Sequence, residues 1–276
     1  MTTPSAPTPD PSELLELARG IAIRAGESAL AARRAGVEVA ATKSTPTDIV
    51  TAVDRETETL IRRLIHEARP HDGVLGEEAA THVGTSGLDW VVDPIDGTVN
   101  FLYGIPAWAV SVAVVAGPPD PESWTALAGV VVNPVTGEVF EATAGGGARV
   151  DGRELRVNAD VELGSALVGT GFGYAAERRL EQAHVLTHLL PRVRDIRRIG
   201  AASLDLCAVA SGQLDAFYER GLHPWDHAAG ALIAREAGAV ITGPRGGREN
   251  AELLIAAAPS VHGDLVDTLR SAGEPV

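Results

Sequence analysis

Hydrophobic residues in the first seventy positions recur at the spacing of helices. The stretch Asp10 to Glu13 carries an N-cap residue, a proline and an acid, and apolar residues three or four apart follow it, so we predict a first helix that ends near Gly36. A second apolar stripe, from Leu60 to Ala68, predicts a second helix that follows Asp54 and ends before Pro70. Two helices are therefore expected before the first strand.

From residue 74 the pattern changes to short apolar runs of strand length, separated by turns rich in Gly, Pro, Asn and Asp. This pattern predicts an antiparallel meander. Its strands are expected at residues 74–77, 88–92, 109–115, 128–133 and 138–143. After Val157, strands and helices alternate, which is typical of a layered α/β arrangement. Strands are expected at 166–170, near 196, and at 215–219 and 253–257, and helices at 176–190, 202–210, 226–238 and 261–269.

The change of pattern divides the chain without separating it into independent domains. We expect a tail over residues 1–10, an α+β half over 11–157 and an α/β half over 158–276. No stretch near the junction is rich enough in Pro, Gly or Ser to act as a linker between separate domains. The two halves are therefore predicted to form one compact unit of layered helices and sheets.

Composition narrows the classes of function. With 276 residues, of which 45% are hydrophobic and only 4% aromatic, the core must consist mostly of Ala, Val, Leu and Ile. A net charge of −14 would repel the phosphate backbone of nucleic acids, so we do not expect direct nucleic-acid binding. The single cysteine, Cys207, excludes an intramolecular disulfide, and no apolar run has the length of a membrane span. The first ten residues lack the features of a signal peptide, so we expect a cytoplasmic protein.

The stretch from Trp90 to Phe101 carries the most chemistry. The apolar run Leu88 to Val92 should be a buried strand that ends at Asp93, and Asp96 should cap the helix that begins after it. Two carboxylates beside a helix N-terminus suit divalent cations held between the acids and a phosphate, because carboxylate oxygens bind Mg²⁺ and backbone N–H groups bind phosphate. The alternative is a capped turn in which both acids only satisfy backbone donors.

Three other motifs accompany this stretch. They are Gly76-Glu77-Glu78, the segment from Lys43 to Asp54 with its Val-Thr-Ala-Val-Asp ending, and the segment from Gly221 to Trp225-Asp226. In this order and spacing, the four motifs resemble those of the inositol monophosphatase family, which comprises Mg²⁺-dependent, lithium-inhibited phosphatases, and especially its bacterial inositol-1-monophosphatase type. The resemblance covers the chain from about Leu14 to Asp264. It implies a sandwich of alternating helix and sheet layers (αβαβα) of the sugar-phosphatase type.

The resemblance also implies a set of metal ligands. Two to three Mg²⁺ ions would be bound by the side chains of four acids and by one backbone carbonyl oxygen. The acids are Glu77, Asp93, Asp96 and Asp226, and the carbonyl is that of Ile95. Such a set is physically sensible, because converging carboxylates repel one another unless cations neutralise them. The simpler interpretations are a helix N-cap for Asp226 and an exposed loop acid for Glu77.

The family further implies that Thr98 and Asp54 activate a metal-bound water that attacks the phosphate directly, while the N–H groups of Gly97 and Thr98 hold that phosphate. In the family, the residues matching Glu219 and Ala202 meet the sugar, and the one matching Lys43 supports the site from a loop. Glu219 could instead be an ordinary acid at a strand end, and Lys43 a solvated charge.

The expected function is hydrolysis of inositol 1-phosphate or a related polyol phosphate, a small phosphate monoester. Histidinol phosphate, fructose 1,6-bisphosphate and a 3′-phosphonucleotide remain alternative substrates within the family. An interaction protein in transcription or ribosome assembly is an alternative of another class. We also expect a homodimer, both from the resemblance and because the apolar strands from Ala109 to Val132 could offer a face to a partner.

Overall fold

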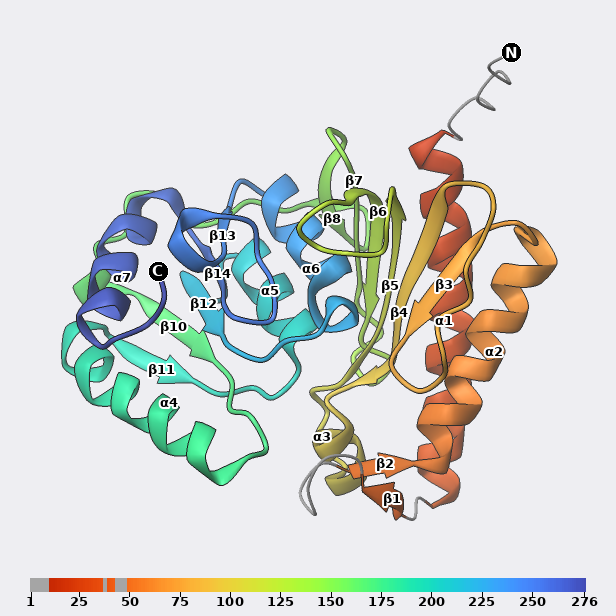
Figure 1. The fold of residues 1–276 in the computed structure, drawn as a ribbon, viewed down its shortest axis with the longest axis horizontal. Coiled ribbons are helices and arrows are strands. Elements are labelled where there is room, and N and C mark those ends of the chain that lie inside the picture. The colour runs from red at the N-terminus through yellow and green to blue at the C-terminus, as the bar shows by residue number, and fades with distance from the viewer. Residues whose placement is uncertain (1–9, 37–38, 43–48) are drawn as a thin grey trace.

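The computed structural model describes residues 10–36, 39–42 and 49–276. Five layers follow one another across the molecule in Figure 1. A pair of helices, α1 and α2, covers a seven-stranded sheet, a second pair, α5 and α6, separates it from a five-stranded sheet, and α4 and α7 cover the far side. The predicted αβαβα sandwich is therefore confirmed.

The two N-terminal helices form as the apolar spacing predicts. Helix α1 spans Pro11–Ala35, and the carboxylate of Asp10 accepts a hydrogen bond from the Ser12 N–H at its start. Helix α2 spans Ala52–Ala68. It begins two residues before Asp54, so this acid lies in the first turn instead of preceding the helix. The short strands β1 (Val39–Thr42) and β2 (Ile49–Thr51) pair just before α2. The lysine at position 43 lies outside the described residues.

The seven-stranded sheet has its strands in sequence order. Its members are β3 (Gly73–Gly76), β4 (Leu88–Asp96), β5 (Ala109–Ala116), β6 (Thr125–Val132), β7 (Val139–Thr143), β8 (Gly147–Val150) and β9 (Arg153–Glu154). The antiparallel prediction holds from β4 onward, whereas β3 and β4 are parallel. The chain turns back along β3, where His82 pairs with Val74, and so enters β4 in the same direction.

Strand β4 is longer than predicted. It continues through Pro94 to Asp96, with an irregularity in its pairing to β5 between Asp93 and Asp96. The expectation that the strand ends at Asp93 is therefore wrong. Proline is tolerated here because the ladder to β5 is already interrupted at this point.

The five-stranded sheet is mixed, in the order β11-β10-β12-β14-β13. Its strands are β10 (Leu167–Thr170), β11 (Asp195–Arg197), β12 (Ala216–Glu219), β13 (Val240–Thr242) and β14 (Leu254–Ala257), and β13, only three residues long, was not predicted. The helices that cover it are α4 (Ala176–Leu189), α5 (Ala202–Ala210), α6 (Pro224–Glu236) and α7 (Pro259–Ser271).

The middle layer joins the two sheets through small residues. Helix α5 and residues 227–234 of α6 are almost wholly buried, and one hydrophobic cluster contains side chains from both sheets and both helices. Cys207 lies in this cluster, fully buried. Gly129 lets the sheet approach α6 closely, since a Cβ on it would lie 3.0 Å from the Cα of Ala229. The two halves thus share a core.

This packing removes one reason for expecting a dimer. Residues 109–115 of β5 are buried, because α1 packs on one face of the sheet and α6 on the other. Helices α1 and α6 also pack on β6, whose residues 128–132 are buried, so only the exposed start of β6 is left open to a partner. The homodimer expectation therefore rests on the family resemblance. None of the helices in the described ranges is both long and apolar enough to cross a membrane.

Candidate active site

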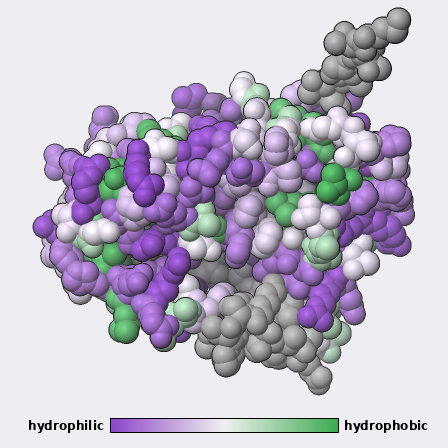
Figure 2. Space-filling model, viewed as in Figure 1, coloured by the Kyte–Doolittle hydropathy of each residue, from purple (hydrophilic) through white to green (hydrophobic). Residues whose placement is uncertain are grey.

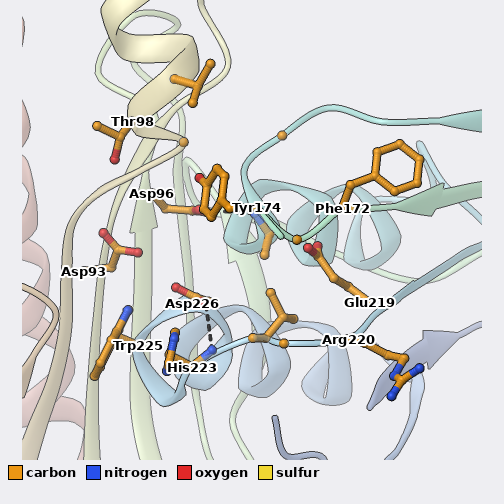
Figure 3. Close-up of a pocket in the computed structure, with 18 of the residues that line it drawn as sticks. Asp93, Asp96, Thr98, Phe172, Tyr174, Glu219, Arg220, His223, Trp225 and Asp226 are labelled. Atoms are coloured by element: carbon orange, nitrogen blue, oxygen red, sulfur yellow. Dashed lines mark hydrogen bonds between the residues drawn. The ribbon is translucent and has the colours of Figure 1, made fainter. Parts of the chain in front are cut away.

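A cavity of about 550 Å³ lies between the two halves, and Figure 2 shows the molecule hollowed there. In the close-up of Figure 3, Asp93 lies on one side of the cavity and Glu219 on the other, with Asp96 and Asp226 between them. Most residues predicted for the site line this cavity, namely Glu77, Asp93, Ile95, Asp96, Gly97, Thr98, Ala202, Glu219 and Asp226. Asp54 does not line it but lies behind Thr98.

Asp93 is delivered to the cavity by β4 and is only 2% exposed. Its Oδ1 accepts a hydrogen bond of 3.0 Å from the Ile95 N–H. Burial raises the pKa of Asp93 well above its usual value, and the carboxylates of Glu77, Asp96, Asp226 and Asp54 raise it further, in that order. The charges with the largest effect on Asp93 are thus all of its own sign.

Asp96 joins the two halves of the chain. One carboxylate oxygen accepts from the Ala202 N–H at 3.2 Å, and the other accepts from the N–H and the hydroxyl of Ser203 at 2.7 and 2.5 Å. Burial raises the pKa of Asp96, and the Ser203 and Ala202 donors together with the positive charge of Arg198 partly offset that rise. The prediction that Asp96 caps the next helix of the chain is therefore wrong, because it binds the N-terminus of α5 instead.

The helix after Asp96 begins differently from the prediction. Helix α3 spans Thr98–Tyr103, and its N-cap is Gly97, which has φ 91° and offers no side chain. A Cβ on Gly97 would also lie 3.1 Å from the carbonyl oxygens of Ala107 and Gly200. Both the left-handed backbone and the tight surroundings require glycine at this position.

Asp226 and Glu77 complete the acidic wall. Asp226 lies in the first turn of α6, and its Oδ2 accepts from the His223 N–H at 2.7 Å, the dashed line in Figure 3. This contact is the capping role that we considered as the simpler interpretation. Burial and then the charges of Glu77 and Asp96 raise the pKa of Asp226 well above its usual value. Glu77 reaches the cavity directly after β3 ends.

These acids suit a hard divalent cation. Within the described ranges, no three His, Cys, Asp or Glu side chains form a ready-made metal cage. Mg²⁺ rarely uses such a cage, because it keeps several waters and binds one or two carboxylates together with substrate phosphate. Mutually repelling buried carboxylates on one cavity wall, beside the Ile95 carbonyl, match that requirement. The donor set therefore fits the ion.

Thr98 and Asp54 are in contact. The Thr98 hydroxyl lies 3.2 Å from Asp54 Oδ1 and 3.2 Å from the Ile95 carbonyl oxygen, so both acceptors share its proton. Asp54 is fully buried, and its other oxygen accepts from the N–H of Thr51 at 2.9 Å and from the Thr51 hydroxyl. This capping box at the start of α2 fixes the carboxylate behind the hydroxyl.

The opposite wall contains Glu219, and a second acid, Asp205 of α5, is buried near it without lining the cavity. Burial raises the pKa of Glu219 to about 8, although the charge of Arg198 lowers it. Burial, followed by the charge of Glu219, likewise raises the pKa of Asp205 to about 8. Arg198 and Asp205 were missed, as was the contact of Ser203 with Asp96. Asp205 is an acid within the apolar run Ala202–Ala210, and this could have marked it as a buried functional residue. Arg198 directly follows Arg197, and both are exposed, so no sequence pattern singled it out.

Glycine also shapes this wall. A Cβ on Gly171 would lie 1.9 Å from Glu219 Oε2, so no other residue leaves room for the carboxylate. Phe172 and Tyr174 follow on the same rim of the cavity, and Ala202, the small residue expected beside the sugar, lines it as well.

Known proteins resemble this chain over nearly all of its length. The sequence model of the inositol monophosphatase family matches residues 10–274. The inositol-1-monophosphatase of Mycobacterium leprae is 45% identical over 290 residues, covering 96% of each chain. The structure of Mycobacterium tuberculosis SuhB superposes with a TM-score of 0.82 at 41% identity, covering 98% of this chain and all of the other. The Nus factor SuhB of Salmonella typhimurium is 38% identical over 229 residues, covering 79% of this chain and 84% of its own.

Proposed function

This chain belongs to the inositol monophosphatase family and is a phosphatase, and from this premise we propose that it hydrolyses inositol 1-phosphate or a related polyol phosphate with the help of Mg²⁺. One observation carries the proposal. A hydroxyl supported by a buried carboxylate, Thr98 on Asp54, faces a cavity whose nearest wall consists of four other carboxylates. Such a wall would repel a phosphate on its own and would attract it once cations are bound.

The residues proposed to hold two to three Mg²⁺ ions are Glu77, Asp93, Asp96 and Asp226, with the carbonyl oxygen of Ile95. When bound, Mg²⁺ would neutralise the phosphate oxygens and lower the pKa of a bound water. The hydrogen bonds of Asp93, Asp96 and Asp226 within the protein hold their carboxylates in place beforehand, which lowers the entropic cost of binding.

The protein's own groups would then handle the proton and the phosphate. Thr98 orients the attacking water through its hydroxyl oxygen, and Asp54 behind it accepts the proton that the hydroxyl passes on. The N–H groups of Gly97 and Thr98, at the start of α3, face the phosphate and balance the charge that develops on it. Attack by water directly on phosphorus requires no covalent enzyme intermediate.

The wall opposite Asp93, called the far wall and lined by Gly171, Ala202 and Glu219, is proposed to contact the polyol. With its pKa raised to about 8, Glu219 carries a proton at neutral pH and can both donate and accept hydrogen bonds with hydroxyl groups. Gly171 and Ala202 leave the space that a six-membered ring needs.

The test is a substrate series on the purified protein with Mg²⁺. Inositol 1-phosphate should be hydrolysed with a higher kcat/KM than histidinol phosphate, fructose 1,6-bisphosphate and a 3′-phosphonucleotide. A higher value for any of the other three would replace the proposed substrate while leaving the phosphatase class intact. Chelation should abolish turnover, and Li⁺ should inhibit it.

A second candidate function follows from one relative, which is named as a Nus factor and is 38% identical to this chain. A contribution to transcription, as an interaction protein, would not require hydrolysis. An Asp93→Asn variant that keeps a transcription partner but loses turnover would indicate that both functions coexist. We also propose a homodimer, which light scattering at micromolar concentration would test.

A further inference from the structure

The acid of the Gly76-Glu77-Glu78 motif, which is proposed as a metal ligand, lies on a short bend just after a strand. Strand β3 ends at Gly76, and residues 77–79, which include Glu77, form a bend outside any strand. The N–H groups of this bend therefore lack partners in the sheet ladder. Hydrogen bonds from another part of the chain hold this bend in place.

That support is Glu58, a side chain of α2 that is 1% exposed. Its carboxylate accepts from the Glu78 N–H at 2.7 Å and from the Ala79 N–H at 3.0 Å. Arg62, one turn further along α2, donates to the same carboxylate at 2.7 Å and to the Ala79 carbonyl oxygen at 3.1 Å. One turn of a helix thus holds both backbone N–H groups that follow Glu77.

Gly76 provides the space for this contact. A Cβ on Gly76 would lie 2.6 Å from the carboxyl carbon of Glu58. Gly76 itself is fixed by its parallel pairing with Val92, the residue before Asp93. The segment is therefore held on one side by the strand that carries Asp93 and on the other by Glu58.

Glu58 lies four residues after Asp54, on the same face of α2. Asp54 contacts the Thr98 hydroxyl from the first turn, and Glu58 contacts the bend from the second. We propose that Glu58 is a positioning residue for cation binding: it holds the bend that presents Glu77 and fixes its distance from the Thr98–Asp54 pair along one rigid helix. This inference rests on the proposed function, because it takes Glu77 to be a metal ligand.

A carboxylate is needed for this task. Two backbone N–H groups and the Arg62 guanidinium all donate to it, so three donors meet two acceptor oxygens. Glutamine has one acceptor oxygen, and its amide group would place a donor against another donor. The Glu58→Gln substitution should therefore loosen the bend with almost no change in side-chain volume.

The experiment titrates the full-length protein with Mg²⁺ alone by calorimetry and, separately, measures hydrolysis of inositol 1-phosphate over a range of Mg²⁺ concentrations. For Glu58→Gln we expect Mg²⁺ affinity about 10–100-fold weaker, the range for supporting partners of metal ligands, with turnover recovering at saturating Mg²⁺. The matched control is Glu56→Gln, an exposed acid on the same helix, which should leave both quantities unchanged.

Gly76→Ala provides an independent variant, because it pushes the intact Glu58 carboxylate away from the bend and should weaken Mg²⁺ binding likewise. If Glu58→Gln does not melt cooperatively, this variant decides the result. A purely structural Glu58 would lower the melting temperature while leaving the Mg²⁺ affinity of the folded protein unchanged, and that result would overturn the proposal. A wild type that binds no Mg²⁺ would instead overturn the proposed function on which it rests.

Discussion

The two walls of the cavity contain acids that differ in what surrounds them. On the near wall, formed by Glu77, Asp93, Asp96 and Asp226, the largest effects on Asp93 are burial and other carboxylates. Glu219 on the opposite, far wall and the buried Asp205 beside it are near the guanidinium of Arg198, which also affects Asp96 between the walls. A buried acid without a positive neighbour must either stay protonated or bind a cation from solution. This difference supports our proposal that the near wall binds ions and that the far wall contacts hydroxyl groups.

The strongest test of this difference is Asp93→Asn. The amide keeps the shape but removes an anionic ligand, so we expect turnover to fall by at least about 10³-fold and Mg²⁺ affinity to fall with it. Steady-state kinetics and calorimetry would measure the two effects. Asp89→Asn, on the same strand outside the cavity, is the control and should retain activity. A near-normal rate for Asp93→Asn would mean that the near wall is not the ion site.

Thr98→Ala should separate chemistry from ion binding on the near wall. The substitution removes the hydroxyl that Asp54 supports, so turnover should fall by about 10²-fold while Mg²⁺ affinity stays within a few-fold of the wild type. Thr98→Ser keeps the hydroxyl and should retain most of the turnover. If the alanine variant lost Mg²⁺ binding as severely as Asp93→Asn, this division of roles would be contradicted.

Asp205, buried beside the far wall, should make the stability of the protein depend on pH. The pKa of Asp205 is raised from 3.8 to about 8, so the folded protein holds a proton that the unfolded chain releases above pH 4. Stability from this group is therefore complete below about pH 4 and is lost as pH rises through 8. In the presence of a chelator, Asp205→Asn should gain stability relative to the wild type as pH rises from 4 to 8, by on the order of 5 kcal/mol.

Denaturant unfolding at pH 4, 6 and 8 would measure this trend. Asp264→Asn, at an exposed position on α7, is the control and should show a constant difference from the wild type. A stability difference for Asp205→Asn that shrinks with rising pH would have the wrong sign and would refute the protonated state.

The smallest expected effect belongs to Glu219→Gln. An amide resembles the protonated acid, so one hydrogen bond to the polyol should be weakened and KM should rise by roughly 2–10-fold, with little change in kcat below pH 8. A parallel drop of kcat and Mg²⁺ affinity would place Glu219 on the ion-binding side and remove the contrast between the walls.

Much of the near wall was predictable because each motif is local. Glu77 follows β3, Asp93 lies within β4 and Asp226 lies in the first turn of α6, so the direction of each side chain depends on neighbours in the sequence. Helix α5 was predicted with its observed bounds for the same reason. Pairings between distant segments carry no such pattern. Asp96 meets the start of α5 across 106 residues, and Glu58 meets the bend after β3 across 20, so neither contact could be inferred from spacing.

The contact of Asp96 with α5 has a consequence for how this protein can change over time. Two of the three donors to its carboxylate are main-chain N–H groups, at Ala202 and Ser203, and every residue type except proline supplies such a group. Mutations can therefore alter the side chains of α5 that face the substrate without breaking the tie that aligns the two halves. Descendants of this sequence can therefore change which alcohol of a phosphate monoester they accept while they keep the proposed ion-binding wall.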